Sequence, residues 1–322
     1  MSTSPESVSA VIIAYNSKAF IRDAIESVLA QTHPVDEIVV VEDGTDDGTA
    51  GIVAEYADRG MRYIHQENQG CAGARNTGIR ATTGTYVAVL DADDIWLPEK
   101  TEQQLALMTG EPNVVITAGN KIWWDIDQDT RTPFYYSEEE RAAIKREIFV
   151  NNPIGNPSMT LIRRTALEQV GLFDPEATYG DDWECWMRLL EVGDAAFHKQ
   201  PVIVYRWHSS NISQRNQVER MRFLERVAIR WIWKAAPLWY RPIAHLRMVS
   251  KTEFQLAALA DREGAYGGHL RHALLALVTW PFDRPWEKAV RLARAIIGQG
   301  GYRALRERLR PAGLQNRWMG QP

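Results

Sequence analysis

Cysteine is scarce in this 322-residue sequence, which contains only Cys71 and Cys185. Two cysteines form no disulfide framework, and no histidines accompany them in the spacing of a zinc site. A reducing compartment fits this composition. We also expect no secretory signal, because residues 1–7 contain neither a basic segment nor an apolar core. No apolar run approaches the roughly 18 residues of a membrane-spanning helix, so we predict a cytoplasmic protein.

The glycine-rich loops with which many proteins hold phosphates are also missing. After the first apolar run comes Tyr15-Asn-Ser17, without the glycines of the dinucleotide fingerprint G-x-G-x-x-G or of the P-loop. A calcium-binding EF-hand counted from Asp91 has glutamate at its twelfth position, as Glu102 provides, but it also needs glycine at its sixth position, where Trp96 stands. The sequence therefore argues against a dehydrogenase, a P-loop ATPase and an EF-hand protein.

The net charge of −4 hides two regions of opposite charge. Residues 1–211 carry 17 Lys and Arg against 33 Asp and Glu, whereas residues 212–322 carry 20 against 8. Six of the twelve tryptophans lie beyond residue 213. We predict one domain over residues 1–213 and a basic, tryptophan-rich helical extension over residues 214–322, whose partner is anionic.

Basic residues alternate with aromatic and aliphatic ones along this extension at helical spacing. Such amphipathic helices are typical of contact with an anionic membrane surface. The alternative is a helical cap that packs on the first domain and on itself. His269 and His272 are three residues apart, and we expect both at the surface because no further metal ligands accompany them. No nucleic-acid motif occurs, so we expect no nucleic-acid partner.

Short apolar runs alternate with helical patterns in the first part of the chain. The runs predicted as strands cover residues 8–14, 37–41, 61–65 and 87–91, and the helices cover residues 19–31, 49–57 and part of 72–82. This alternation predicts an α/β fold with a mainly parallel, Rossmann-like sheet and helices on both faces. Ligands of such sheets bind at the carboxyl ends of the strands, which places Tyr15, Asp43 and Asp91 along one edge.

Three carboxylates directly follow the last of these strands, in Leu90-Asp-Ala-Asp-Asp94. Their repulsion is costly unless a cation or a proton relieves it. Residues i and i+2 of an extended segment share a face, so Asp91 and Asp93 can serve one hard ion such as Mg²⁺ or Mn²⁺. A solvated loop is the alternative for this stretch taken alone. We expect Asp94 to cap the turn into the following helix.

The middle of the chain offers further candidates. Aromatic residues at 121–124 and 134–136 flank an acidic turn and predict a short hairpin, in which the rings either pack or stack on sugars. Residues 151–157 contain two prolines and a glycine and are predicted as a loop. Asp181 and Asp182 begin a helix whose core face includes Trp183. One acidic side chain is enough to interact favourably with the partial positive charge at the start of that helix, yet the sequence has two acids there.

Four separated motifs occur in a fixed order: Val11-Ile-Ile-Ala-Tyr-Asn16, Val39-Val-Val-Glu-Asp-Gly44 with Asp46-Asp-Gly-Thr49, Gly73-Ala-Arg-Asn-Thr-Gly-Ile79, and Leu90-Asp-Ala-Asp-Asp94. Together they resemble glycosyltransferase family 2, the inverting enzymes of GT-A fold that take sugars from nucleotide diphosphates. The resemblance runs from Val8 to about Ser213. It implies a nucleotide-sugar half at about 1–117 and an acceptor half at about 118–213.

The resemblance also implies roles for individual residues. Those on the donor side are Tyr15 and Asp43 at the nucleotide base, Arg75 at the base or diphosphate, and Asp91-Ala-Asp93 as the D-x-D metal motif, with Asp93 the direct ligand in preference to Asp91. His208, in Tyr205-Arg-Trp-His208, would meet the metal or the diphosphate. Asp182 would be the catalytic base, and Asn156, Asp181 and Trp183 are expected on the acceptor side. Glu42 departs from the aspartate of many relatives.

The expected function is a metal-dependent inverting glycosyltransferase with Mg²⁺ or Mn²⁺ as cofactor. A UDP-sugar is the favoured donor, and a glycan or lipid-linked acceptor of polysaccharide synthesis is the expected partner, with a peripheral position at the cytoplasmic face of the inner membrane. A nucleotidyltransferase of similar fold is one alternative, but its glycine- and lysine-rich loop is absent where Tyr15-Asn-Ser-Lys18 stands. A non-catalytic sugar-binding or scaffold protein is the other, and a donor-hydrolysis assay separates it from an enzyme.

Overall fold

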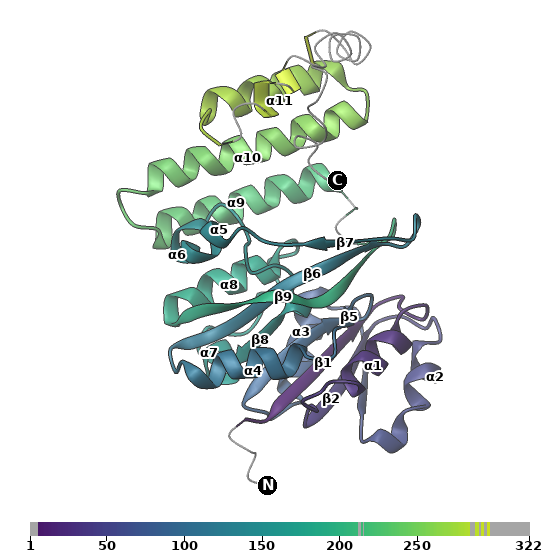
Figure 1. Cartoon of the computed structure of the whole chain (residues 1–322). Helices are drawn as coiled ribbons and strands as arrows, with labels where there is room; N and C mark the ends of the chain where they lie inside the picture. Colours follow the sequence, from purple (N-terminus) through teal and green to yellow (C-terminus); the bar gives the residue numbers. More distant parts are fainter. Residues whose placement is uncertain are drawn as a thin grey trace, which may run out of the picture. The chain divides into compact units, whose positions relative to one another are not determined.

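The computed structural model of the chain describes residues 6–211, 214, 216–283, 287–289, 291–292 and 295–296. The chain divides into two compact units, residues 1–217 and a second unit that begins at Val218 (Figure 1). The first unit is an α/β domain built on one sheet, and the described part of the second is helical. Each unit is described separately below.

The first half of the sheet is parallel. Its strands are β1 (Val8–Ala14), β2 (Glu37–Asp43), β3 (Arg62–Gln66) and β4 (Tyr86–Asp91), which lie in the order β3-β2-β1-β4. The helical elements between them are α1 (Ile21–Leu29), α2 (Thr49–Ala54), η1 (Ala57–Arg59) and α3 (Gly70–Arg80). Strand β1 is buried along its whole length, as expected for a strand covered on both faces. The predicted strand and helix order of this half is confirmed.

Beyond β4 the sheet continues as β8-β6-β9-β5 and is mixed in direction. The strands are β5 (Ile95–Trp96), β6 (Val114–Asp125), β7 (Thr130–Phe134), β8 (Thr160–Arg163) and β9 (Asp194–Trp207). The helical elements are α4 (Lys100–Gly110), α5 (Glu138–Ala142), α6 (Ile144–Glu147), η2 (Pro157–Met159), α7 (Arg164–Gln169) and α8 (Asp181–Val192). Strands β6 and β7 form the predicted hairpin. The loop predicted at 151–157 leads into η2, whose first residue is Pro157.

Helix α3 lies unusually close to the sheet because of one glycine. A Cβ atom built on Gly78 would lie 2.2 Å from Val11 Cγ1 and 3.2 Å from Val41 Cγ2, so only glycine permits this approach. The helix contacts both β1 and β2. This packing fixes Arg75, one turn earlier on the same helix, against the end of the sheet.

The second unit contains α9 (Gln217–Ala235), α10 (Arg241–Arg262) and α11 (Tyr266–Thr279), and α10 packs along α11. His269, expected at the surface, is fully buried, with Nδ1 3.5 Å from Asp261 Oδ1. That expectation was wrong because α10 covers this side of α11. His272 lies partly exposed beside Glu253 of α10. Within the described part of the chain, no helix combines the length and hydrophobicity needed to cross a bilayer.

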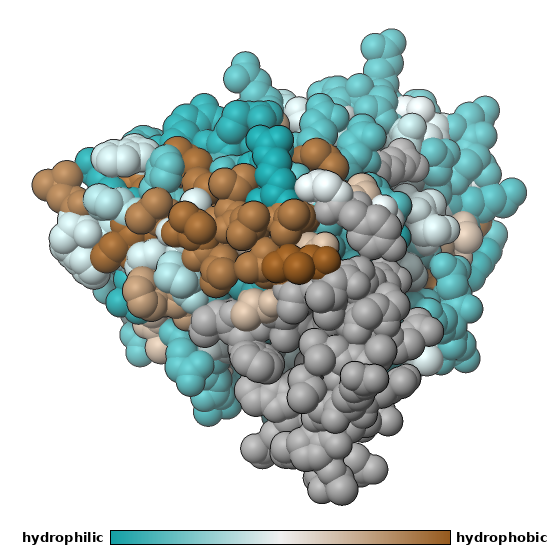
Figure 2. All heavy atoms as spheres, turned by 90° about the horizontal axis from the view of Figure 1, so that it is seen from above, coloured by the Kyte–Doolittle hydropathy of each residue, from teal (hydrophilic) through white to brown (hydrophobic). Residues whose placement is uncertain are grey.

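Large hydrophobic side chains are exposed on the second unit, and Figure 2 shows hydrophobic surface gathered on one face of the molecule. Those more than half exposed are Val218, Trp233, Leu238, Trp239, Val278, Phe282 and Ile296. On α9 the exposed positions include Arg226, Arg230, Trp233 and Lys234, whose spacing of four, three and one places them on one helical face. This face therefore mixes basic and aromatic side chains next to Leu238 and Trp239.

Candidate functional site

The carboxylate turn lies where the parallel strands end. Asp91 is the last residue of β4, and its backbone N–H donates to Ser158 Oγ at 3.1 Å. The turn is closed by Asp94 N–H, which donates to Asp91 O at 2.9 Å. The carboxylates of Asp91 and Asp93 are 25% and 31% exposed, so both reach solvent from the turn. The structure thus brings two predicted metal ligands to one surface.

Arg75 joins this turn to the helix of the proposed catalytic base. Its Nη2 donates to Asp91 Oδ1 at 2.9 Å, and its Nη1 donates to Asp181 Oδ2 at the start of α8. The guanidinium is buried and lies 5.5 Å from the centre of the Phe173 ring. Burial alone would lower the pKa of Arg75, but the charges of Asp181 and Asp91 hold that pKa above its ordinary value. Arg75 is therefore a charged link between β4 and α8.

Asp94 does not cap the following helix, so that expectation was wrong. Its carboxylate is buried, where Oδ2 accepts from Asn156 Nδ2 at 2.8 Å and Oδ1 accepts from Arg206 N–H at 3.4 Å. Burial, followed by the charges of Asp93 and Asp91, raises the pKa of Asp94 well above its usual range. Asn156, expected on the acceptor side, uses its amide nitrogen to hold this carboxyl group. Among the described residues, its buried Oδ1 has no hydrogen-bond partner.

Asp93 and His208 face each other across the turn. His208 Nε2 lies 3.5 Å from Asp93 Oδ2, and Asn211 Nδ2 donates to the same oxygen at 3.0 Å. The imidazole stacks on Phe20, with ring centroids 4.8 Å apart, and its Nδ1 lies 2.7 Å from Ser210 Oγ. Stacking and hydrogen bonding fix the ring so that Nε2 is directed at the carboxylate. The two predicted ligands are thus brought together from the residue that follows β9 and from the turn after β4.

A complete metal site made of protein ligands is not present in the part of the chain that the structure describes, where no three acidic, histidine or cysteine side chains converge. Asp93 and His208 offer one oxygen and one nitrogen, and Asp91 shares Oδ1 with Arg75. Carboxylate and water oxygens are ligands that suit Mg²⁺ and Mn²⁺. These residues fit a divalent ion whose remaining ligands come from water or from a bound diphosphate.

Arg206 is a site residue that the sequence did not reveal. It is 2% exposed and donates to the backbone carbonyl oxygens of Asp93, Ala92 at 3.3 Å and Phe20 at 3.1 Å. It also forms an ion pair with Asp23 at 2.6 Å. The side chain thus holds the path of the carboxylate turn against α1. The sequence offered one indication that Arg206 belongs to the site, namely its position two residues before His208 at the end of an apolar strand.

The donor-side residues lie at the ends of adjacent parallel strands. Ala14 pairs with Glu42, so Tyr15 and Asp43 each follow a paired position. Tyr15 is 43% exposed, whereas Asp43 is buried and its Oδ1 accepts from Gln66 Nε2 at 2.7 Å and from Gln69 N–H at 2.8 Å. These bonds hold the Asp43 carboxylate firmly. The register of β1 with β2 and β4 places Tyr15, Asp43 and Asp91 along one edge of the sheet, as predicted.

Helix α8 presents its two acids in different environments. Asp181 is buried and paired with Arg75, whereas Asp182 is partly exposed and its Oδ1 accepts from Trp183 N–H at 2.6 Å. Trp183, expected on the acceptor side, is 5% exposed and donates its indole N–H to Ile148 O. Trp186 donates likewise to Gly155 O at 2.9 Å. The tryptophans therefore anchor the helix, and Asp182 is the acid at its solvent-facing start.

Comparison with known proteins identifies the family. The family model described as "Glycosyl transferase family 2" matches residues 9–171, which include both the carboxylate turn and Arg75. The chain belongs to this glycosyltransferase family. An uncharacterized glycosyltransferase of Rickettsia typhi is 30% identical over 226 residues, which cover 67% of this chain and 70% of the relative. The putative teichuronic acid biosynthesis glycosyltransferase TuaG of Bacillus subtilis is 29% identical over 234 residues, covering 68% and 90%.

Solved structures show that this glycosyltransferase has the GT-A fold. The crystal structure of S. aureus TarS 1-349 in complex with UDP-GlcNAc has a TM-score of 0.63 and 15% identity, covering 94% of this chain and 90% of that one. The mannosyltransferase PcManGT of Pyrobaculum calidifontis, in complex with GDP-Man and Mn²⁺, has a TM-score of 0.57 and 20% identity, covering 96% and 89%. In another TarS structure the match spans 56% of the solved chain.

Proposed function

We propose that this glycosyltransferase transfers a sugar from a nucleotide diphosphate to an acceptor hydroxyl group, with inversion and with the help of a divalent metal ion. The observation that carries the proposal is the double ion pair of Arg75, which fixes Asp91 of the carboxylate turn and Asp181 of α8 to one cation. We infer that the neighbouring acids, Asp93 and Asp182, lie at the two sides of one site. The group that activates the donor and the group that removes the proton must be held at fixed positions relative to each other for the reaction to be fast.

The donor is expected along the ends of β1, β2 and β4. Tyr15 has an exposed ring that can stack on a nucleotide base, and the carboxylate of Asp43 is held by Gln66 and Gln69 at the neighbouring strand end. A UDP-sugar is the favoured donor. Support comes from the TarS complex with UDP-GlcNAc, a protein of the same fold.

Asp93 and His208 would hold the divalent ion, with Asp91 beside it. When bound, the ion supplies positive charge that stabilises the negative charge developing on the leaving diphosphate. Support comes from the PcManGT complex, which contains Mn²⁺ together with GDP-Man. Arg206 contributes by holding the backbone of the turn, so that the carboxylates need no reorganisation during the reaction.

Asp182 is the proposed catalytic base. Its carboxylate takes the proton of the acceptor hydroxyl group while the hydroxyl oxygen forms a bond to the anomeric carbon and the bond from that carbon to the diphosphate oxygen breaks. Attack occurs opposite the leaving group, so a single displacement inverts the configuration. The N–H of Trp183 orients Asp182 Oδ1, and the paired Asp181 cannot serve because Arg75 occupies it.

The acceptor is expected to be a glycan or a lipid-linked glycan of polysaccharide synthesis. TuaG, which carries the name of a teichuronic acid biosynthesis enzyme, is a relative that supports this class. We place the enzyme at the cytoplasmic face of the membrane, with the basic and aromatic face of α9 on anionic lipid. Arg230 and Lys234 supply the charge, and Trp233, Leu238 and Trp239 supply the exposed apolar area.

The decisive test replaces Asp182 with asparagine. Asp182→Asn keeps the shape of the side chain but cannot accept the proton, so transfer should fall by at least about a hundredfold, the contribution typical of a general base. Donor binding should persist, and calorimetry with UDP-sugars and Mn²⁺ measures it. Asp58→Asn, which changes an exposed acid of η1, is the matched control. Normal turnover by Asp182→Asn would show that another group removes the proton.

A further inference from the structure

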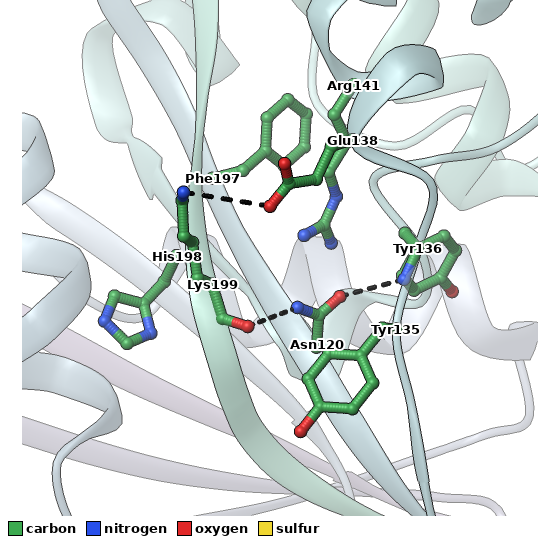
Figure 3. A pocket seen from close by; sticks show the side chains of 8 residues that line it. All are labelled: Asn120, Tyr135, Tyr136, Glu138, Arg141, Phe197, His198 and Lys199. Atoms are coloured by element: carbon green, nitrogen blue, oxygen red, sulfur yellow. Dashed lines mark hydrogen bonds and ion pairs between the residues drawn. The ribbon is translucent and has the colours of Figure 1, made fainter.

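A pocket of about 380 Å³ lies in the second half of the sheet, beside the aromatic residues at 134–136 that were expected either to pack or to stack on sugars. Figure 3 shows its lining, which comes from β6, the segment after β7, α5 and β9. The lining residues are Asn120, Tyr135, Tyr136, Glu138, Arg141, Phe197, His198 and Lys199. The volume falls at the lower end of the roughly 300–1,000 Å³ of small-molecule sites. One or two sugar rings are ligands of suitable size.

The pocket is built around an irregularity of the sheet. Ala118 pairs with Phe197 and Asn120 pairs with Pro201, so three residues of β9 stand opposite one residue of β6. The buried Asn120 holds both walls, because its Nδ2 donates to Lys199 O at 2.7 Å and its Oδ1 accepts from Tyr136 N–H at 3.0 Å. Bulges of this kind commonly mark functional sites. The hollow is thus a fixed feature of the backbone.

The pocket is separate from the proposed reaction centre. Lys199 and His208 are nine residues apart on one extended segment, which corresponds to a length of up to about 30 Å at roughly 3.3 Å per residue. The loop before η2 connects the two regions, since Arg141 Nε donates to Pro153 O at 3.2 Å and Asn156 of the same loop holds Asp94. A long acceptor could therefore contact both regions at once.

The pocket contains a cation enclosed by aromatic rings. The guanidinium of Arg141 lies between Phe197 and Tyr136, at 4.6 and 4.9 Å from their ring centres (Figure 3). It is 8% exposed and donates to the carbonyl oxygens of Gly119 and Pro153, and no carboxylate of the described residues forms an ion pair with it. Burial lowers the pKa of Arg141 to about 10. A buried cation with only neutral partners would gain from an anionic ligand.

The rim of the pocket is exposed and suited to a sugar ring. Tyr135 is 57% exposed, so its ring can cover the apolar face of a pyranose. Lys199 and Glu138 face each other at 3.8 Å, with both side chains more than 80% exposed. Such a pair contributes little to stability and is readily exchanged for another partner. An acidic ligand could therefore recruit Lys199.

We propose that this pocket is a second carbohydrate subsite, which holds an acidic sugar unit of the acceptor away from the reacting hydroxyl group. The inference rests on the proposed function, because it assigns the pocket to a glycan acceptor. The ligand chemistry is a pyranose ring that carries an anionic group, either the carboxylate of a uronic acid or a phosphate. Tyr135 covers the ring, while Arg141 and Lys199 bind the anion.

The test measures binding of defined tetrasaccharides to the full chain by calorimetry, in EDTA and without donor. The probes are a glucuronic acid tetramer, a phosphate-linked glucose tetramer and a neutral glucose tetramer. We expect at least one acidic probe to bind about tenfold more tightly than the neutral one, with affinity falling as salt rises. The stronger of the two acidic probes identifies which anion the pocket prefers. Equal binding of all three probes, or no binding, would overturn the proposal.

Two variants localise the binding while sparing Arg141, whose loss could unfold the loop. Tyr135→Ala should weaken acidic binding by about fivefold to tenfold and Lys199→Glu by about fivefold. Lys145→Glu is the matched control, because Lys145 is also exposed and paired with a carboxylate, Asp194, but does not line the pocket. Equal losses in Lys199→Glu and Lys145→Glu would reveal unspecific charge attraction and refute the subsite. Thermal unfolding verifies that each variant is folded.

Kinetics separate this proposal from the catalytic one. Tyr135→Ala should raise KM for the acidic tetrasaccharide about fivefold while kcat and donor hydrolysis stay unchanged, whereas Asp182→Asn should abolish transfer while tetrasaccharide binding stays unchanged. If Asp182→Asn remains active but Tyr135→Ala loses acidic binding, the assignment of the base is wrong and the subsite stands. If Tyr135→Ala retains full binding and KM, the subsite is wrong whatever Asp182 does.

Discussion

Arg75→Met tests whether the buried cation is the structural link between the carboxylate turn and α8. The substitution leaves Asp181 and Asp91 without their shared partner, and their side chains are 12% and 25% exposed. Removing one member of a buried ion pair costs about 3–5 kcal/mol, because the remaining charge is uncompensated. Solvent reaches Asp91, so we expect a loss of about 3 kcal/mol, near the lower limit.

Urea unfolding followed by tryptophan fluorescence measures this loss. The expected change lowers the midpoint without altering the slope, since the surface exposed on unfolding stays the same. In thermal unfolding, about 3 kcal/mol corresponds to roughly 6–12 °C for a unit of this size. Arg22→Met is the control, because Arg22 forms an ion pair with Glu55 in which both side chains are about half exposed, and it should change stability little.

A double-mutant cycle assigns the loss to the ion pair. Asp181→Asn removes one of the two charges, so adding it to Arg75→Met should recover about 1–3 kcal/mol of the lost stability. Wild-type stability in Arg75→Met, combined with a loss of donor affinity, would refute the structural link and return Arg75 to the donor role implied by the family resemblance. Strictly additive losses in the double variant would also contradict the pairing.

Three further predictions concern the metal, the membrane and a buried lysine. Asp93→Ala should lower donor affinity in Mn²⁺ at least about tenfold and abolish its sensitivity to EDTA; unchanged, EDTA-insensitive binding in calorimetry would contradict the metal role. Trp239→Ser should reduce sedimentation with phosphatidylglycerol vesicles, whereas equal sedimentation would count against membrane contact. Burial holds the pKa of Lys100 well below 10.5 in the folded chain. Above that lowered pKa the folded chain has released a proton that the unfolded chain still binds. The stability of the wild type relative to Lys100→Met should therefore rise with pH up to about 10.5. Parallel stability curves of the two proteins would exclude this titration.

Local patterns were sufficient to predict the first half of the fold. The continuously apolar runs at 8–14 and 87–91 predict strands covered on both faces. The burial of β1 and β4 confirms this prediction. Parallel pairing then places Tyr15, Asp43 and Asp91 at one edge, as the register of β1 with β2 and β4 shows. The sequence could predict this because strand polarity alone decides where the carboxyl ends meet.

Long-range partners could not be predicted from local patterns. Asp94 is held by Asn156, 62 residues away, and the turn is held by Arg206, 113 residues from Asp93. Periodicity indicates that a residue faces the core but not which distant side chain it meets there. The same limit explains His269, whose burial depends on how α10 lies against α11.

Each of the three carboxylates of the turn has a different partner, which limits their mutual repulsion. Asp91 is paired with Arg75, Asp94 is buried with a raised pKa beside Asn156, and Asp93 faces His208 and Asn211. Arg75 already offsets the charge of Asp91, so a cation at this turn gains mainly from Asp93. One carboxylate and one imidazole give a weak site for a hard divalent ion, which prefers about six oxygen ligands. Strong metal binding would therefore need the phosphate oxygens of the donor, and the metal and the nucleotide-sugar should bind cooperatively.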